Sequence, residues 1–214
     1  MKVQENIIIS DDFFFIVLII AFLLSAILKS SYWKHTKILL KATFAQRYAN
    51  QFLREDNVFT ERVNIISFLI MTLTFSVIII KKLAVISLLQ SLITIGLVFI
   101  FYMMKIFVIK VLGYLFMIKD FSKLAIFFSL IYDRSVGILL LPLILVLCFF
   151  SFEIYTELLY FIFYVIGFFI LVKLYMLWKI ARRMYAVSHF YIFLYLCNLE
   201  FFPILILGKS LFIG

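Results

Sequence analysis

The sequence predicts an all-α, polytopic membrane protein, and three observations point to this fold class. Of the 214 residues, 67% are hydrophobic, and the mean hydropathy is +1.22. Soluble domains average roughly 45–50% apolar residues, so a soluble fold of this length could not bury so much apolar surface. Long apolar runs alternate with clusters of basic residues, which is the pattern of successive spans. Almost no sequence remains for a soluble domain, so we expect one integral membrane domain over residues 1–214.

Fifteen of the twenty lysines and arginines fall into three clusters. The clusters occupy residues 29–62, 105–123 and 173–183, and two apolar runs lie between each successive pair. Cytoplasmic loops carry the excess of Lys and Arg, so we expect all three clusters in the cytoplasm and both termini in the periplasm. Because the charges flank apolar runs, the net charge of +9 indicates membrane topology rather than nucleic-acid binding.

A transmembrane helix needs about 20 mainly apolar residues, and the apolar runs suffice for six such helices. The first run lacks a basic segment followed by a small-residue cleavage site, so we expect a retained span. Lys81 and Lys82, after the second run, and Lys173, in the fifth, are expected to snorkel to the interface. Residues 105–122 are either a separate interfacial helix, which we prefer, or an extension of the third span. The expected spans are 13–28, 63–80, 83–104, 124–150, 158–178 and 190–207.

The segment 33–57 is predicted to begin as an amphipathic helix on the cytoplasmic surface and to end in a polar turn. Its apolar positions recur at helical spacings, and basic residues fall between them. These basic residues, and those that end the fifth span, are candidates for contact with a partner subunit or with lipid headgroups. The apolar positions are Trp33, Leu40, Phe44, Tyr48 and Phe52. The candidate contact residues are Lys34, Lys37, Lys41, Arg47, Arg54, Glu55, Arg182 and Arg183.

Glu200 is the sharpest candidate for chemistry, because ionisable groups inside a bilayer are costly and are functional suspects. At about 100° per residue, His189, Glu200 and Pro203 share one helix face. Pro203 cannot donate its backbone hydrogen bond, so the Leu199 carbonyl is freed close to Glu200. This pattern suits a proton or cation site, and it equally suits a neutral or paired Glu that holds helices together. His189 is either a pH-sensing group or a structural hydrogen-bonding group.

Asp133 and Arg134 are the second candidate, near the edge of the fourth span. Arg134 either meets Glu200 or a lipid phosphate, or the pair marks the cytoplasmic edge of the span. Cys148 and Cys197 both lie in apolar runs, where Cys usually behaves as a small hydrophobe. The chain has two histidines in all, and their placement predicts no metal site and no cofactor. P-loop, dinucleotide-binding, zinc-protease and serine-hydrolase motifs are absent, which disfavours enzymes of those architectures.

Three stretches carry a family resemblance: residues 50–57, the Gly-Ile-Leu-Leu-Leu-Pro-Leu run at 137–143, and residues 189–203, closing near Lys209. Together they resemble an uncharacterised family of small multi-span inner-membrane proteins of Bacteroidota, known only as a domain of unknown function. The resemblance implies an inner-membrane location, and it supplies no activity for this chain. It also marks Arg54, Glu55, Glu200 and Pro203 as positions of interest, without roles.

These observations favour a non-enzymatic integral subunit or scaffold of a larger cell-envelope assembly, such as a secretion, motility or envelope-biogenesis machine. The expected partners are membrane lipids and either other membrane subunits or further copies of the chain, with no nucleic acid. A small transporter or lipid-handling protein that uses Glu200, Asp133 and Arg134 is the first alternative. The second alternative is an intramembrane enzyme that acts on a lipid-linked substrate.

Overall fold

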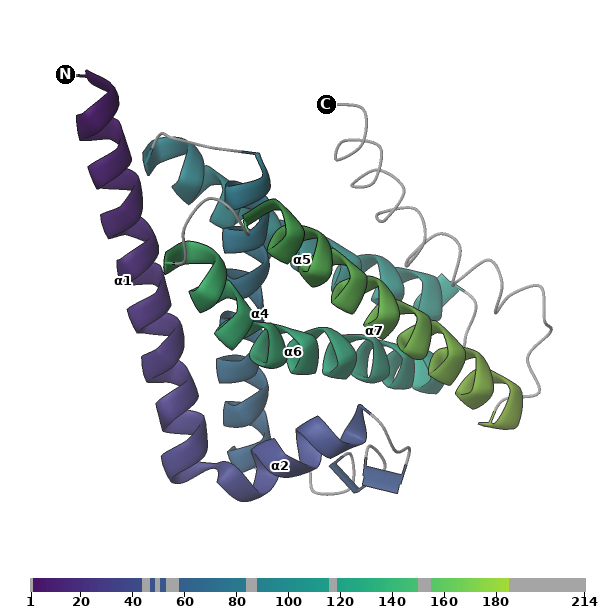
Figure 1. Cartoon of the computed structure of the whole chain (residues 1–214). Helices are drawn as coiled ribbons and strands as arrows, with labels where there is room; N and C mark the ends of the chain where they lie inside the picture. Colours follow the sequence, from purple (N-terminus) through teal and green to yellow (C-terminus); the bar gives the residue numbers. More distant parts are fainter. Residues whose placement is uncertain are drawn as a thin grey trace. The chain divides into compact units, whose positions relative to one another are not determined.

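The computed structural model describes residues 2–43, 47–48, 51–52, 58–83, 88–115, 119–149 and 155–184 (Figure 1). Within these ranges the chain is helical and contains no strand, which confirms the all-α class. The principal helices are α1 (Lys2–Ser31), α2 (Trp33–Ala42), α4 (Val58–Lys82), α5 (Leu88–Leu115), α6 (Lys119–Phe149) and α7 (Tyr155–Met184).

Five of these helices contain a stretch that is long and apolar enough to cross a membrane. They correspond in order to the first five expected spans, so the protein is a multi-pass membrane protein. The sixth expected span, 190–207, lies outside the described residues. The stretches are Phe13–Ser31, Val58–Lys82, Leu88–Val111, Ile126–Phe149 and Tyr155–Met176.

The third spanning helix extends beyond its predicted second end. It is described from Leu88, and it continues without a break from Lys105 to Leu115. The preference for a separate interfacial helix over 105–122 is therefore wrong for residues 105–115. Lys is a good helix former, so Lys105 and Lys110 interrupt the apolar pattern without interrupting the helix.

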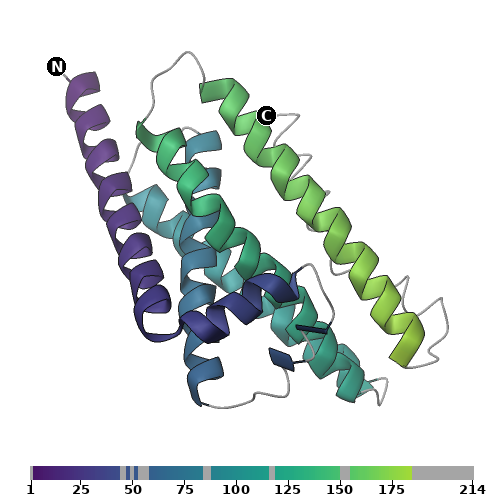
Figure 2. The ribbon, with the colours of Figure 1, turned by 60° about the horizontal axis from the view of Figure 1, so that its bottom comes forward.

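Backbone contacts divide the chain into two compact units, the first made of Met1–Phe101 with Ile131–Ile166 and the second of Tyr102–Leu130 with Gly167–Gly214. In the first unit α1 packs along α4, and α2 contacts both helices. The chain bends at Tyr32, and α2 then runs away from the axis of α1 in both views (Figures 1 and 2). At the bend the Tyr32 amide donates to the Leu28 carbonyl at 3.2 Å.

Small hydroxyl side chains line the buried parts of α4. Ser67, Thr74 and Ser76 are each buried, and each hydroxyl donates to the backbone carbonyl four residues earlier at 2.6 Å. The acceptors are the carbonyls of Val63, Ile70 and Thr72. The buried hydroxyls are thus satisfied within their own helix, and they need no partner from a neighbouring one.

At Gly137, α6 lies close to the backbone of α4. A Cβ built on Gly137 would lie 2.6 Å from the Cα atom of Met71. Real Cβ atoms essentially never come that close to a backbone atom, so only glycine fits here without moving one helix. Pro142 follows on the same helix and is exposed.

Side chains from α1, α4 and α7 meet at the end of the first unit that holds Lys81. The Lys81 ammonium lies 4.1 Å from the centroid of the Phe14 ring, within cation–π range. The Tyr155 hydroxyl donates to the Lys81 carbonyl at 2.7 Å. The rings of Phe15 and Phe149 also meet edge to face, with centroids 6.2 Å apart. Lys81, expected to snorkel, is therefore held over an aromatic ring.

Candidate functional site

Side-chain hydrogen bonds join α6 to α4 and to α2 within the first unit. Arg134 Nη1 donates to the Asn64 Oδ1 atom at 2.5 Å. The neighbouring Ser135 is fully buried, and its hydroxyl donates to the Leu39 carbonyl at 3.4 Å. Two adjacent residues of α6 thus bond to two different helices. We call Arg134, Asn64, Ser135 and Leu39 the polar junction.

Arg134 places a guanidinium inside the membrane-spanning stretch Ile126–Phe149. Its Nε atom is buried and has no hydrogen-bond partner among the residues that the structure describes. Asp133 precedes it and is half-buried. A charged group at this depth is costly and is a functional suspect. The partner that the structure gives to Arg134 is Asn64, and Glu200, the partner considered from the sequence, lies outside the described residues.

The helix α2 buries one face against the first unit and leaves a basic face exposed. At about 100° per residue, Lys34, Lys37 and Lys41 fall within about 60° of one another. All three side chains are exposed, and we call them the basic ridge. The buried face carries Thr36, Ile38, Leu39 and Ala42.

The face that α2 buries against protein differs from the apolar stripe predicted to lie on the membrane surface. Trp33 is 49% exposed and Leu40 is half-buried, whereas Ile38 and Leu39 are buried. The stripe was chosen over twenty residues, and α2 spans ten. Among the other stripe positions Phe52 is buried. Contact of the stripe with the membrane surface stays a prediction.

Aromatic and polar contacts fix the start of α2 to the start of α4. The Arg62 Nη1 atom donates to the Tyr32 hydroxyl at 3.3 Å. The His35 ring stacks on the Phe59 ring with centroids 6.2 Å apart and an interplanar angle of 4°. Phe59 also packs against Tyr32, with ring centroids 6.2 Å apart. Tyr32 therefore anchors the bend between two helices.

The structure describes only some of the remaining residues that were predicted to contact partners or lipid or to act inside the membrane. Arg47 is exposed. Arg182 and Arg183 lie in the last turn of α7, where only the backbone is described. The residues outside the described ranges are Arg54, Glu55, His189, Glu200 and Pro203.

Sequence reasoning missed Asn64 and Ser135 as members of the polar junction. Their signal was present, because both are polar residues inside apolar runs. Lys173 also differs from its expectation. Its side chain is only 2% exposed, whereas an ammonium that snorkels to the headgroup region keeps its charged end in water.

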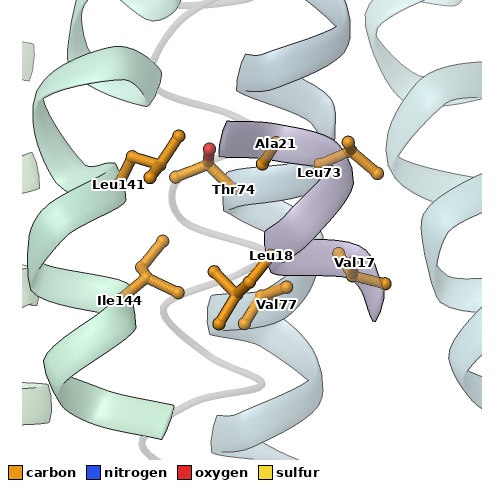
Figure 3. Close-up of a pocket in the computed structure, with 8 residues that line it drawn as sticks. All are labelled: Val17, Leu18, Ala21, Leu73, Thr74, Val77, Leu141 and Ile144. Carbon is orange, nitrogen blue, oxygen red and sulfur yellow. The ribbon is translucent and has the colours of Figure 1, made fainter. Parts of the chain in front are cut away.

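A small apolar pocket lies between α1, α4 and α6 (Figure 3). It has a volume of about 10 Å³ for a water-sized sphere, which is close to the space that one water needs. Thr74 supplies the single hydroxyl of its lining, and that hydroxyl is bonded to its own helix. The pocket is too small and too apolar for a substrate site. Its lining residues are Val17, Leu18, Ala21, Leu73, Thr74, Val77, Leu141 and Ile144.

Comparisons with known proteins give a family and no activity. The family model described as a domain of unknown function, DUF4271, matches residues 14–211. No curated protein and no solved structure matches the chain. Within the described part of the chain, no group of three His, Cys, Asp or Glu side chains is placed to hold a metal ion.

Proposed function

This chain belongs to the DUF4271 family, and we propose that it is a non-enzymatic integral subunit or scaffold of a larger cell-envelope assembly. Secretion, motility and envelope-biogenesis machines are the classes of assembly that it suits. The observation that carries the proposal is the basic ridge on α2, a charged surface that a multi-pass membrane protein holds in a fixed position. The resemblance to Bacteroidota proteins supports a place in the inner membrane. The three basic clusters support an orientation with both termini in the periplasm and the ridge in the cytoplasm.

The ridge is rigid because α2 is attached at several points. Ser135 binds its backbone at Leu39, Arg62 binds the preceding bend, and His35 stacks on α4. A surface that is ordered before it binds loses less conformational entropy in the complex. Scaffolds depend on such preformed surfaces, so this attachment supports a docking role.

The ridge is also available for contact. Neither Lys34 nor Lys37 forms an ion pair with any residue that the structure describes, and both are exposed. The helix α2 contains no acidic residue that would neutralise them. Among the described residues, no carboxylate therefore neutralises the Lys34 and Lys37 ammonium groups, which present a positive surface to another component of the assembly.

Purification in a mild detergent tests the proposal. The tagged protein, purified from solubilised native membranes, should carry other membrane proteins with it in fixed stoichiometry. Cross-linking before solubilisation should retain these partners. Lys82→Gln leaves the ridge intact and changes the other end of α4, so this control variant should recover the same partner proteins. A single homogeneous species, recovered without partners both with and without cross-linking, would contradict the subunit role.

A transporter or lipid-handling role is the second candidate, and Arg134 is the observation that favours it. A guanidinium inside a span with an unbonded Nε is the type of group that lines polar paths through membranes. Proteoliposomes that contain a pH-sensitive dye test this role. Glu200→Gln and Arg134→Gln should each abolish proton-coupled flux while the protein stays folded and inserted. Full flux in the Glu200→Gln variant would contradict the transporter hypothesis.

A further inference from the structure

We propose that the basic ridge binds the headgroups of anionic phospholipids in the leaflet where α1 ends. This inference rests on the proposed function, because it names the component that contacts the surface on which that proposal depends. Lipid headgroups would hold α2 at a fixed depth and angle.

The depth of α2 follows from the chain itself. The membrane-spanning stretch of α1 ends at Ser31, and α2 begins two residues later at Trp33. The next spanning stretch begins at Val58, at the same end of the first unit. Since both stretches terminate beside α2, this helix lies at the boundary between the hydrocarbon and the headgroups. Trp33 is 49% exposed there, as expected for an interfacial aromatic residue.

The apolar face of α2 is occupied by protein, which determines how the helix can meet lipid. Ile38, Leu39 and Ala42 are buried against the first unit, so they are not inserted into the acyl chains. The surface that remains for lipid is the basic ridge. Contact through charge rather than through apolar insertion requires a partner with negative charge at the headgroup level, and anionic phospholipid supplies it.

The chemistry of the ridge suits phosphate diesters packed in a plane. Lys34 and Lys41 are seven residues apart, so their backbones are separated by about 10 Å along the helix. The Lys41 ammonium lies 5.2 Å from the centroid of the Tyr48 ring, which orients it. Lys34 and Lys37 have no ion-pair partner among the described residues. These two residues are therefore the ones whose charge is open to lipid phosphate.

Native mass spectrometry of the full-length protein tests the inference with phosphatidylglycerol as the anionic probe. The protein in mild detergent is given equal amounts of phosphatidylglycerol and phosphatidylcholine, and the ratio of the two bound lipids is measured. A lysine near an anionic surface contributes about fivefold in affinity, so Lys34→Gln/Lys37→Gln should lower the phosphatidylglycerol preference by on the order of 25-fold. Lys34→Arg/Lys37→Arg should keep it, because the charge remains. Added salt should weaken the wild-type preference, since exposed charges are screened.

The matched control removes two charges at the other end of α4, in Lys81→Gln/Lys82→Gln, and should keep the phosphatidylglycerol preference. Thermal unfolding of each variant shows that it is folded. The inference is overturned if Lys34→Gln/Lys37→Gln keeps its preference, or if the control loses as much. It is also overturned if Lys34→Gln/Lys37→Gln no longer retains an acidic protein partner while its retention of phosphatidylglycerol stays unchanged. Partner recovery is measured separately, so the lipid site and the subunit role can fail independently.

Discussion

Arg134 on α6 donates a hydrogen bond to Asn64 on α4, 70 positions earlier in the chain, with Nη1 and Oδ1 2.5 Å apart. This bond joins two membrane-spanning helices through a charged donor and a neutral acceptor. Inside a protein the local dielectric is low, so the bond is strong and the loss of either partner is costly. The two losses are not equivalent, because one removes a charge and the other leaves it behind.

Replacing Asn64 should therefore be more damaging than replacing Arg134. Asn64→Leu leaves a buried guanidinium without its acceptor and should destabilise the protein by about 2–4 kcal/mol. Arg134→Met removes the charge along with the bond and should cost less. The double variant should be more stable than Asn64→Leu alone, and unfolding in a denaturing detergent measures all four proteins of the cycle. Strict additivity of the two single effects would show that the side chains do not interact.

Gly137→Ala should destabilise the packing of α6 on α4. The added Cβ would lie 2.6 Å from Met71 Cα, and overpacking of this kind costs about 1–3 kcal/mol. Gly96→Ala is the matched control, because a Cβ there meets no atom within 4 Å. That substitution should be neutral or stabilising by up to about 1 kcal/mol through helix propensity. Equal thermal unfolding temperatures for the two variants would contradict the close approach of the helices.

Tyr155→Phe should weaken the attachment of the start of α7 to the end of α4. The change removes the hydroxyl that donates to the Lys81 carbonyl at 2.7 Å, a loss of about 0.5–1.5 kcal/mol. Tyr164→Phe on the same helix is the control, because Tyr164 is 78% exposed. Thermal unfolding in detergent should separate the two variants. If Tyr155→Phe lost no more stability than Tyr164→Phe, the Lys81 bond would contribute nothing measurable.

Labelling of single cysteines should place α2, which contacts α4, and the Lys82 end of α4 on opposite sides of the membrane. The helix Val58–Lys82 has 25 residues, or about 37 Å at 1.5 Å per residue. In a background with Cys148→Ala and Cys197→Ala, a membrane-impermeant maleimide should label Lys82→Cys from the periplasm. Lys37→Cys should react only in inverted vesicles. Labelling of both positions from one side would overturn the orientation drawn from the basic clusters.

The sequence could predict the spanning helices because their signal is local. A run of apolar residues long enough for the bilayer, as in α4, identifies a span without knowledge of its neighbours. The continuation of α5 past Lys105 was the second of two alternatives, because a charge often marks the end of an apolar span, although Lys favours helix. A lysine lowers the local hydropathy, but its high helix propensity lets the helical backbone continue through it.

The polar junction could not be predicted in the same way. Arg134 was identified as a candidate, but its partner Asn64 is 70 positions away, and nothing in either local sequence specifies the other. The face that α2 buries against protein was also not predicted, because ten residues offer more than one apolar arc. Burial of Ile38 rather than Trp33 depends on the helices that α2 packs against. Both cases depend on tertiary contacts, which a single sequence does not display.

The hydroxyls of α4 act as spacers between helices rather than as links. Because Ser67 and Ser76 bond to carbonyls of their own helix, their contribution to neighbouring helices is their small volume. Close packing in a membrane depends on such small side chains. It follows that α4 should accept alanine at these positions more readily than leucine, and that its surface is specified by size rather than by polarity. The charged bond from Arg134 would then provide the directional specificity that the spacers lack.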